Sequence, residues 1–158
     1  MQRKIKKYKG GEPPKYVAFM CYSHHDSEFV LRHIRPEIER RLEVDMSRSE
    51  GLLCINDRDF RVGEPIEEAI VRSVLASSMI ILIISEKFMD SQWCKFEMNI
   101  AWLEKKPILM ILKERVLVRK LPYLLKNIYN KNTRLTWTGE NRKNEFIENL
   151  YKSMLNKL

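Results

Sequence analysis

Short apolar runs recur along the chain, and stretches with helical spacing separate them. Four such runs are Tyr16–Tyr22, Leu52–Ile55, Met79–Ile84 and Ile108–Leu112, and a fifth β-favouring segment is Arg134–Trp137. The run at 79–84 is apolar at every position, which is typical of a central parallel strand covered on both faces. The pattern therefore predicts five strands.

Between these runs, apolar residues return every three or four positions, as on one face of a helix. The positions are Leu31, Ile34, Ile38 and Leu42, then Ile66, Ile70 and Val74, then a short helix over 91–104, and last Phe146, Leu150 and Met154. Pro65 suits the first position of the second helix, whereas 113–131 shows no clear period. Strands alternating with helices predict an α/β fold, with a parallel sheet covered on both faces.

Acidic residues mark where the first helix is expected to begin. Asp26 and Glu28 lie where the positive end of a helix dipole favours carboxylates. Their placement predicts that both residues lie at the N-terminus of this helix.

The composition agrees with one globular domain. The chain has 158 residues, of which 44% are hydrophobic and 32% charged, with only 5 Gly and 6 Pro. This excludes a disordered, collagen-like or disulfide-stapled chain. The longest apolar run, Met79–Ile84, is far shorter than the roughly 20 residues of a membrane span, and the N-terminus lacks a signal peptide's apolar stretch. Cys21, Cys54 and Cys94 lie among apolar residues, so we expect buried, reduced thiols.

Positive charge is concentrated at the start of the chain. The first fifteen residues contain six Lys and Arg against one Glu, a net charge of +5 out of the total of +8. We therefore predict a basic tail over 1–14 and a folded domain over 15–158. Such a tail binds anionic surfaces and, in a receptor, follows the membrane span; a disordered soluble leader is the alternative. Basic residues interleaved with aromatics on the domain are absent, so no nucleic-acid partner is expected.

Motifs for catalysis or metal binding are absent. No GxGxxG or GxxxxGK[ST] pattern occurs, and the cysteines do not form a CxxC pair. His24, His25 and His33 lack zinc-ligand spacing, so we expect surface or capping histidines and no metal site. Cys94 follows a tryptophan and precedes Lys95, but no neighbouring base supports a nucleophile.

Three ordered segments resemble the signature boxes of Toll/interleukin-1 receptor (TIR) domains. Tyr16–Asp26 resembles the first box, Arg58–Ile66 resembles the second box or BB loop, and Ser85–Glu97 is similar to the segment after the third strand. The resemblance covers about 15–157. It departs from the family at Val62, where many Toll-like receptors carry Pro, and at 146–147, where the third box pairs Phe with Trp.

The resemblance implies a flavodoxin-like, three-layer fold whose five-stranded parallel sheet has the order 2-1-3-4-5. It also implies the cytoplasmic signalling domain of a Toll-like innate immune receptor, joined to a membrane through an adjoining span and the basic tail. Its partners would be TIR domains of the same receptor and of adaptors, bound through the BB loop. The residues that match are Phe19, Tyr22, Ser23 and Asp26 in the first box, and Arg58, Asp59, Phe60, Arg61, Val62, Gly63, Glu64 and Pro65 in the BB loop.

The BB-loop residues are expected to have different roles. Arg61, Val62 and Glu64 are the expected exposed contacts, an apolar centre with a polar rim. Asp59 and Phe60 are open to two interpretations, a partner contact or internal support of the loop. Outside the loop, we expect Trp93 to pack in the core, and Tyr22 and Ser23 to cap the first strand.

Two alternatives from other classes stay open. Some TIR domains hydrolyse NAD, and Glu97 matches the position of their catalytic glutamate, where a carboxylate can stabilise positive charge on a ribose. A glutamate early in a helix is also favoured by the helix dipole alone. In that alternative NAD is a substrate; otherwise no cofactor is expected. The second alternative is a soluble TIR adaptor.

Overall fold

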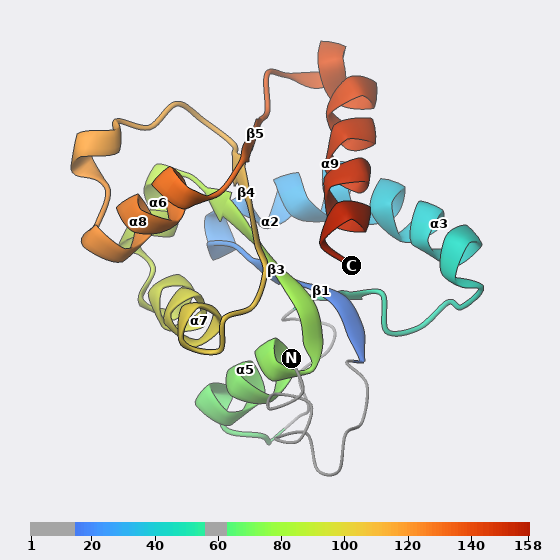
Figure 1. Ribbon diagram of the computed structural model, residues 1–158, viewed down its shortest axis with the longest axis horizontal. Helices are drawn as coiled ribbons and strands as arrows, with labels where there is room; N and C mark the ends of the chain where they lie inside the picture. Colours follow the sequence, from blue (N-terminus) through green and yellow to red (C-terminus); the bar gives the residue numbers. More distant parts are fainter. Residues whose placement is uncertain (1–14, 56–62) are drawn as a thin grey trace.

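A five-stranded parallel sheet with helices on both faces forms the domain (Figure 1). The computed structural model describes residues 15–55 and 63–158. Its strand order is β2-β1-β3-β4-β5, which confirms the flavodoxin-like order expected from the resemblance. The elements in chain order are β1 (Tyr16–Cys21), η1 (His24–Asp26), α2 (Ser27–Phe29), η2 (Val30–Ile34), α3 (Arg35–Met46), β2 (Leu53–Cys54), α5 (Ile66–Leu75), β3 (Ser77–Ile84), α6 (Glu86–Asp90), α7 (Gln92–Leu103), β4 (Ile108–Leu112), η3 (Val118–Lys120), α8 (Tyr123–Lys131), β5 (Arg134–Thr136), η4 (Glu140–Arg142) and α9 (Lys143–Lys157).

Two apolar layers sandwich the sheet. On one face, Met79, Ile81 and Ile83 of β3 pack with buried residues of α3 and α9. On the other face, Ile80 and Leu82 pack with residues of α5, α7 and α8. Figure 1 shows α3 and α9 on one side of the sheet and α5, α7 and α8 on the other. Because successive strand residues point to opposite faces, a strand covered on both must be apolar throughout, as the sequence predicted.

Because all five strands are parallel, their amino ends lie along one side of the sheet, the amino edge, and their carboxyl ends along the opposite side, the carboxyl edge. β1 pairs with both β2 and β3, and β3 also pairs with β4. The segments after β1, β3 and β4 therefore meet at the carboxyl edge, where α/β folds build their sites. The chain enters β1 and β4 at the opposite, amino edge.

The first helix differs from its expected form. The periodicity of Leu31, Ile34 and Leu42 predicted one continuous helix, but the chain forms α2, then the π-helical turn η2, then α3. The Arg35 N–H donates to the Val30 carbonyl, five residues back. Pro36 follows at once and has no N–H to continue the ladder, so the wider turn precedes the proline.

The second helix begins one residue later than expected. Pro65 is the N-cap of α5 and Ile66 is its first residue. The side chain of Ile66 is 53% exposed, whereas Ile70 and Val74 are buried with Ala69. Assigning Ile66 to the buried face was therefore wrong, because the first turn of α5, residues 66–68, is exposed and burial begins at Ala69. The unassigned stretch 113–131 contains η3 and α8.

No helix in the described part of the chain combines the length and apolar character that a membrane span needs. The expected tail over 1–14 lies outside the described residues.

Candidate functional site

The first box is built mostly of buried residues at the carboxyl end of β1. Phe19 and Tyr22 belong to the apolar layers on opposite faces of the sheet. Ser23 is buried, and its side chain accepts a hydrogen bond from the His25 N–H at 3.3 Å, which caps η1. This box therefore supports the loops of the site from within the domain, because its buried residues have little exposed surface for contact with a partner.

Asp26 joins the ends of three strands. Its Oδ1 accepts from Lys113 Nζ at 2.6 Å, and its Oδ2 accepts from Ser85 Oγ at 2.5 Å. Ser85 follows β3 and Lys113 follows β4, while Asp26 lies in the segment after β1. The Ser85 Oγ also accepts from the Phe88 N–H and so caps α6. One buried carboxylate thus fixes three loops at the carboxyl edge.

This geometry gives Asp26 a role beyond its expected place at a helix start. Asp26 is the N-cap residue of α2, as the sequence predicted, but its side chain makes no capping hydrogen bond to that helix and the residue is 2% exposed. An ion pair with Lys113, 87 residues away, competes better for a buried carboxylate because it compensates the charge. Glu28 stays exposed and pairs with Arg32 across one helical turn, at 3.5 Å.

Two thiols and a carboxylate converge beside this ion pair. Cys21 ends β1, and Cys94 and Glu97 lie one turn apart in α7. One donor atom from each of the three lies within 4.8 Å of the others, and all three residues are buried. Thiolates and carboxylates are zinc ligands, so this set can hold a metal that spacing alone did not predict. The donors come from segments 73 residues apart, which no local motif reveals.

The two thiols are electrostatically distinct. Burial raises the pKa of Cys21 well above its ordinary value. The pKa of Cys94 is lowered instead. A hydrogen bond with Cys21 is the largest cause, burial opposes it, and a hydrogen bond with Ser91 lowers the pKa further. Ser91 caps α7, and its Oγ accepts from the Cys94 N–H at 3.2 Å. All three cysteines are buried free thiols, as the sequence predicted.

Glu97 lies inside the domain. Its exposed fraction is 1%, and one of its carboxylate oxygens lies within 4.8 Å of the Cys21 and Cys94 sulfurs. In this conformation, the carboxylate expected to act on NAD in the alternative interpretation is covered. Its burial is the reason why a role in holding α7 against β1 fits the geometry better than direct contact with a substrate.

The BB loop is described only at its end. Arg58, Asp59, Phe60, Arg61 and Val62 lie outside the described residues. Gly63 is exposed with a φ of +83°, a conformation that glycine adopts without strain, and an added Cβ would meet no atom of the described residues within 4 Å. Glycine thus provides the turn by which the loop enters α5.

Glu64 makes an internal ion pair and is less exposed than predicted, while its contact with a partner stays a prediction. Arg72 donates from Nε to Glu64 Oε2 at 2.9 Å and from Nη2 to Oε1 at 2.8 Å. The Glu64 side chain is only 15% exposed. The hydrogen bond to Glu64 raises the pKa of Arg72, although burial opposes it. This pair ties the end of the loop to the last turns of α5.

Replacing Glu64 by Gln is expected to lower the free energy of unfolding by about 1 kcal/mol, since the pair is half-buried and bidentate. Glu67→Gln in the same helix is the matched control, because Glu67 is exposed, and its effect should stay below about 0.5 kcal/mol. Urea unfolding followed by circular dichroism measures both. Equal stability of the two variants would contradict a stabilising role for the Glu64–Arg72 pair.

Trp93 is exposed, which corrects the prediction that it packs in the core. Its side chain is 46% accessible and meets Phe96 edge-on, with ring centroids 6.3 Å apart. Trp93 lies in the first turn of α7, where the buried positions are Cys94, Glu97 and Met98. The aromatic residue next to a buried cysteine therefore falls on the outer side of the helix.

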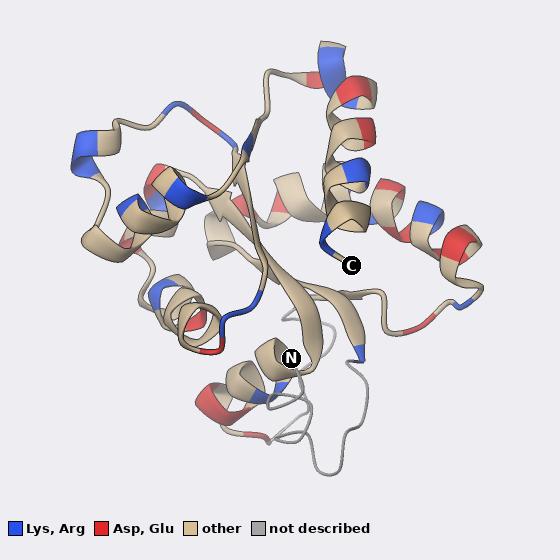
Figure 2. Ribbon diagram, in the orientation of Figure 1, with Lys and Arg blue, Asp and Glu red and all other residues tan. Residues whose placement is uncertain are grey.

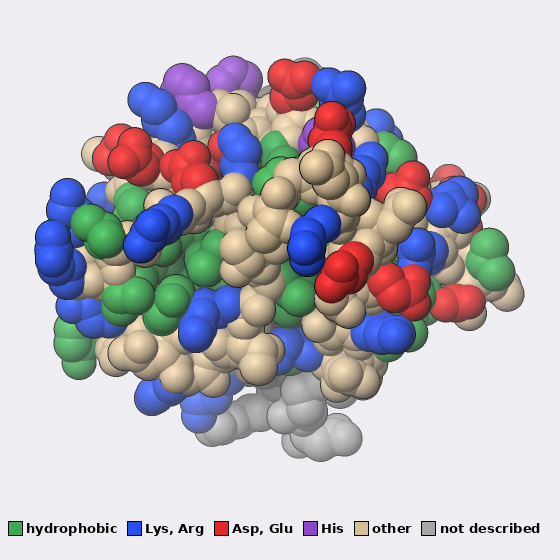
Figure 3. Space-filling view, turned by 90° about the horizontal axis from the view of Figure 1, so that it is seen from above, with side chains coloured by type: hydrophobic (Ala, Val, Ile, Leu, Met, Phe, Trp, Pro, Cys, Tyr) green, Lys and Arg blue, Asp and Glu red, His purple; other side chains and the backbone are tan. Residues whose placement is uncertain are grey.

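The histidines divide into two groups. His24 and His25 are exposed, as expected, and Figure 3 shows histidines on the upper rim in that view. His33 differs, because its ring lies against Phe29 and Trp137 at centroid distances of 6.0 and 5.2 Å. Burial, followed by the charge of Lys143, lowers the pKa of His33. The prediction of a surface or capping histidine was wrong there.

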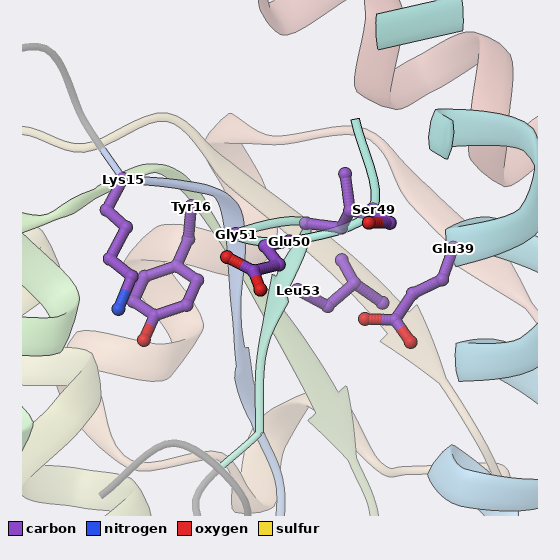
Figure 4. Close-up of a pocket in the computed structure, with 8 residues that line it drawn as sticks. Lys15, Tyr16, Glu39, Ser49, Glu50, Gly51 and Leu53 are labelled. Atoms are coloured by element: carbon purple, nitrogen blue, oxygen red, sulfur yellow. The ribbon is translucent and has the colours of Figure 1, made fainter. Parts of the chain in front are cut away.

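A hollow of about 290 Å³ opens at the amino edge, between the starts of β1 and β2 (Figure 4). Lys15, Glu39 and Glu50 supply charges of both signs to its lining. It lies at the opposite edge of the sheet from Asp26 and Glu97. Tyr16, the first residue of the first box, lines it, whereas Phe19, Tyr22, Ser23, Asp26 and the described residues of the BB loop do not. We therefore do not assign the predicted contacts to this hollow.

Comparison with known proteins gives consistent results. A family model described as "TIR domain" matches residues 18–150. The chain is 32% identical to the Drosophila melanogaster protein Toll over 129 residues, which is 78% of this chain and 11% of that protein. It is 28% identical to human Toll-like receptor 1 over 138 residues, which is 82% of this chain and 16% of the receptor. The chain thus spans less than a fifth of these relatives.

Among solved structures, the TIR domain of the Toll-related receptor TRR-2 from Hydra magnipapillata superposes with a TM-score of 0.70. The two chains are 24% identical, and the match covers 89% of this chain and 99% of that one. At that identity the match supports the fold alone.

Proposed function

Because the chain belongs to the TIR-domain family, we propose that it is the cytoplasmic signalling domain of a Toll-like innate immune receptor. It acts by homotypic association with TIR domains of its own receptor and of adaptors. The observation that carries the proposal is the match to Toll and to Toll-like receptors over most of this chain and only a small part of theirs. A small domain attached to a larger receptor fits a role in which receptor clustering leads to association of the TIR domains.

Exposed apolar side chains at the starts of α5 and α7 support association. Ile66 follows the loop at the start of α5, and Trp93 lies at the start of α7. Both are about half exposed, and α5 packs against α7. Both helices begin at the carboxyl edge of the sheet. Apolar side chains exposed near one edge are typical of an interaction surface.

Association should depend on clustering. Linking several copies raises their effective concentration, so a weak contact between isolated domains becomes productive when receptors gather. The membrane-attached position proposed for 1–14 provides that gathering. The basic charge of those residues fits attraction to the anionic inner leaflet.

The test uses the purified chain on a clustering scaffold, with recruitment of a second, labelled copy and NAD turnover as two readouts. We expect recruitment that rises with scaffold density and no NAD turnover. Glu97→Gln is the control for NAD hydrolysis, the alternative function, since it removes the carboxylate charge with little change in shape. Turnover that disappears in Glu97→Gln would overturn the proposal in favour of NAD hydrolysis. Failure of dense scaffolds to recruit would refute association.

A further inference from the structure

A second hollow, of about 320 Å³, opens at the amino edge of the sheet beside the start of β4. Trp102, Pro107 and Ile108 give it an apolar lining, and Lys105, Lys106 and Lys157 give it positive charge. No acidic side chain of the described ranges lines it. Figure 2 shows the basic turn after α7 and the basic end of α9. The turn after α7 and the end of α9, which are far apart in sequence, thus bring lysines to one hollow.

Two of these lysines, Lys105 and Lys157, form no ion pair with a carboxylate of the described residues. Lys131 is exposed and extends over the Trp102 ring, with its Nζ 5.7 Å from the ring centroid. Glu104 precedes this turn but is not part of the lining. The hollow therefore gathers positive charge around an aromatic ring.

The turn that carries Lys105 and Lys106 is firmly held. Lys105 has a φ of 55°, and its N–H donates to the Trp102 carbonyl at 3.1 Å. The Lys106 N–H donates to the Ala101 carbonyl at 3.0 Å. Its Nζ donates to the carbonyls of Leu75 and Ser77 at 3.0 and 2.8 Å, which anchors the turn to the start of β3. Lys106 thus places positive charge at a fixed position, while Lys105 extends freely.

The hollow opens on the edge of the sheet from which the basic tail departs. β1 and β4 are parallel through β3, so Lys15, just before β1, and Lys106, just before β4, lie at the same edge. The carboxyl edge, with Trp93 and Ile66, faces the other way. A domain attached to a membrane through its N-terminus would turn this edge toward the bilayer.

We infer that this hollow binds the phosphorylated headgroup of an anionic membrane lipid, with Lys105, Lys157 and Lys131 as the phosphate contacts. The inference rests on the proposed membrane-attached function. Ammonium groups suit phosphate oxygens, and the apolar floor suits a ring-shaped headgroup. The expected ligand class is an inositol lipid that carries phosphomonoesters. Binding there orients the domain and leaves the carboxyl edge free for TIR partners.

The experiment measures binding of the full chain to phosphatidylcholine vesicles with and without phosphatidylinositol bisphosphate. The variant Lys105→Gln/Lys157→Gln should lower partitioning roughly 30-fold, at about 1 kcal/mol for each lysine near a membrane surface. Lys95→Gln/Lys152→Gln is the matched control, with the same loss of charge at exposed positions of α7 and α9. It keeps the tail, and its partitioning should stay within about threefold of the unaltered chain. Equal losses in both variants would overturn the site and assign binding to overall charge.

A soluble ligand separates the lipid source from a free anion. Inositol trisphosphate should shift the indole N–H resonance of Trp102 and compete with vesicles, whereas inorganic phosphate should do neither at the same concentration. Competition by inorganic phosphate to the same extent would contradict a headgroup site. Scaffold recruitment in the absence of lipid is scored alongside. Loss of lipid binding with intact recruitment refutes this inference alone, and loss of recruitment refutes the proposed function.

Discussion

Replacing Asp26 by alanine is expected to lower the free energy of unfolding by about 3 kcal/mol, which lowers the melting temperature by roughly 10 °C in a domain of this size. Asp26 is buried and accepts hydrogen bonds from Lys113 and Ser85. Removing it leaves an ammonium and a hydroxyl without their acceptor, where water has limited access. The Lys113 side chain is 29% exposed, which keeps the expected cost below that of a fully buried pair. Thermal unfolding followed by circular dichroism measures the effect.

Two further variants test this cause. Asp90→Ala, at an exposed position of α6, removes a carboxylate without a buried partner and should change the melting temperature by less than about 2 °C. Asp26→Ala/Lys113→Met should recover part of the loss, because no orphaned ammonium remains. If Asp26→Ala were as stable as the unaltered chain, the stability of the loops after β1, β3 and β4 would not depend on Asp26.

Reversing the charge of Arg61 to Glu is expected to abolish recruitment on the clustering scaffold while the melting temperature stays within about 2 °C of the unaltered chain. Arg61 is a charged residue among the expected exposed contacts of the BB loop, and it is tested here because Glu64 already pairs with Arg72. A like charge placed across an interface disfavours the partner by several kcal/mol, whereas an exposed substitution leaves the fold intact. Recruitment of labelled copies and thermal unfolding are measured on the same preparation.

The matched control is Arg142→Glu, at an exposed position of η4 away from the BB loop in the chain. It makes the same change of net charge, so its recruitment should be nearly normal. Equal loss in both variants would assign recruitment to net charge. A large fall in melting temperature for Arg61→Glu would instead give Arg61 a role in supporting the fold.

The fold could be predicted from the sequence because its signals are local. The strand β4 begins and ends where the apolar run does, and α7 follows its expected range within one residue. The central strand was recognisable because residues buried on both faces must be apolar at every position. The ordered boxes carried the family, and the family match and strand order confirm that interpretation.

The roles of single residues were predicted less well. Trp93 was assigned to the core and Glu64 to the surface, and both assignments were wrong. Hydropathy predicts whether a residue type is usually buried, but the rotation of a helix about its axis decides which side faces the sheet. The first turn of α7 points Cys94 inward and Trp93 outward. A glutamate in a loop is exposed unless an arginine such as Arg72 comes within reach, and a helix had to form to bring it there.

By itself, the sequence determined the α/β class, the family and the positions of its loops, because periodicity and ordered motifs depend on residues close together in the chain. The tertiary structure alone decided which of these residues meet. Asp26 with Ser85 and Lys113, Cys21 with Cys94 and Glu97, and the lysines at 105 and 157 are each brought together across 50 to 90 residues. Such contacts depend on the order and register of the parallel strands, and every crossover connection has to be in place before their side chains can meet.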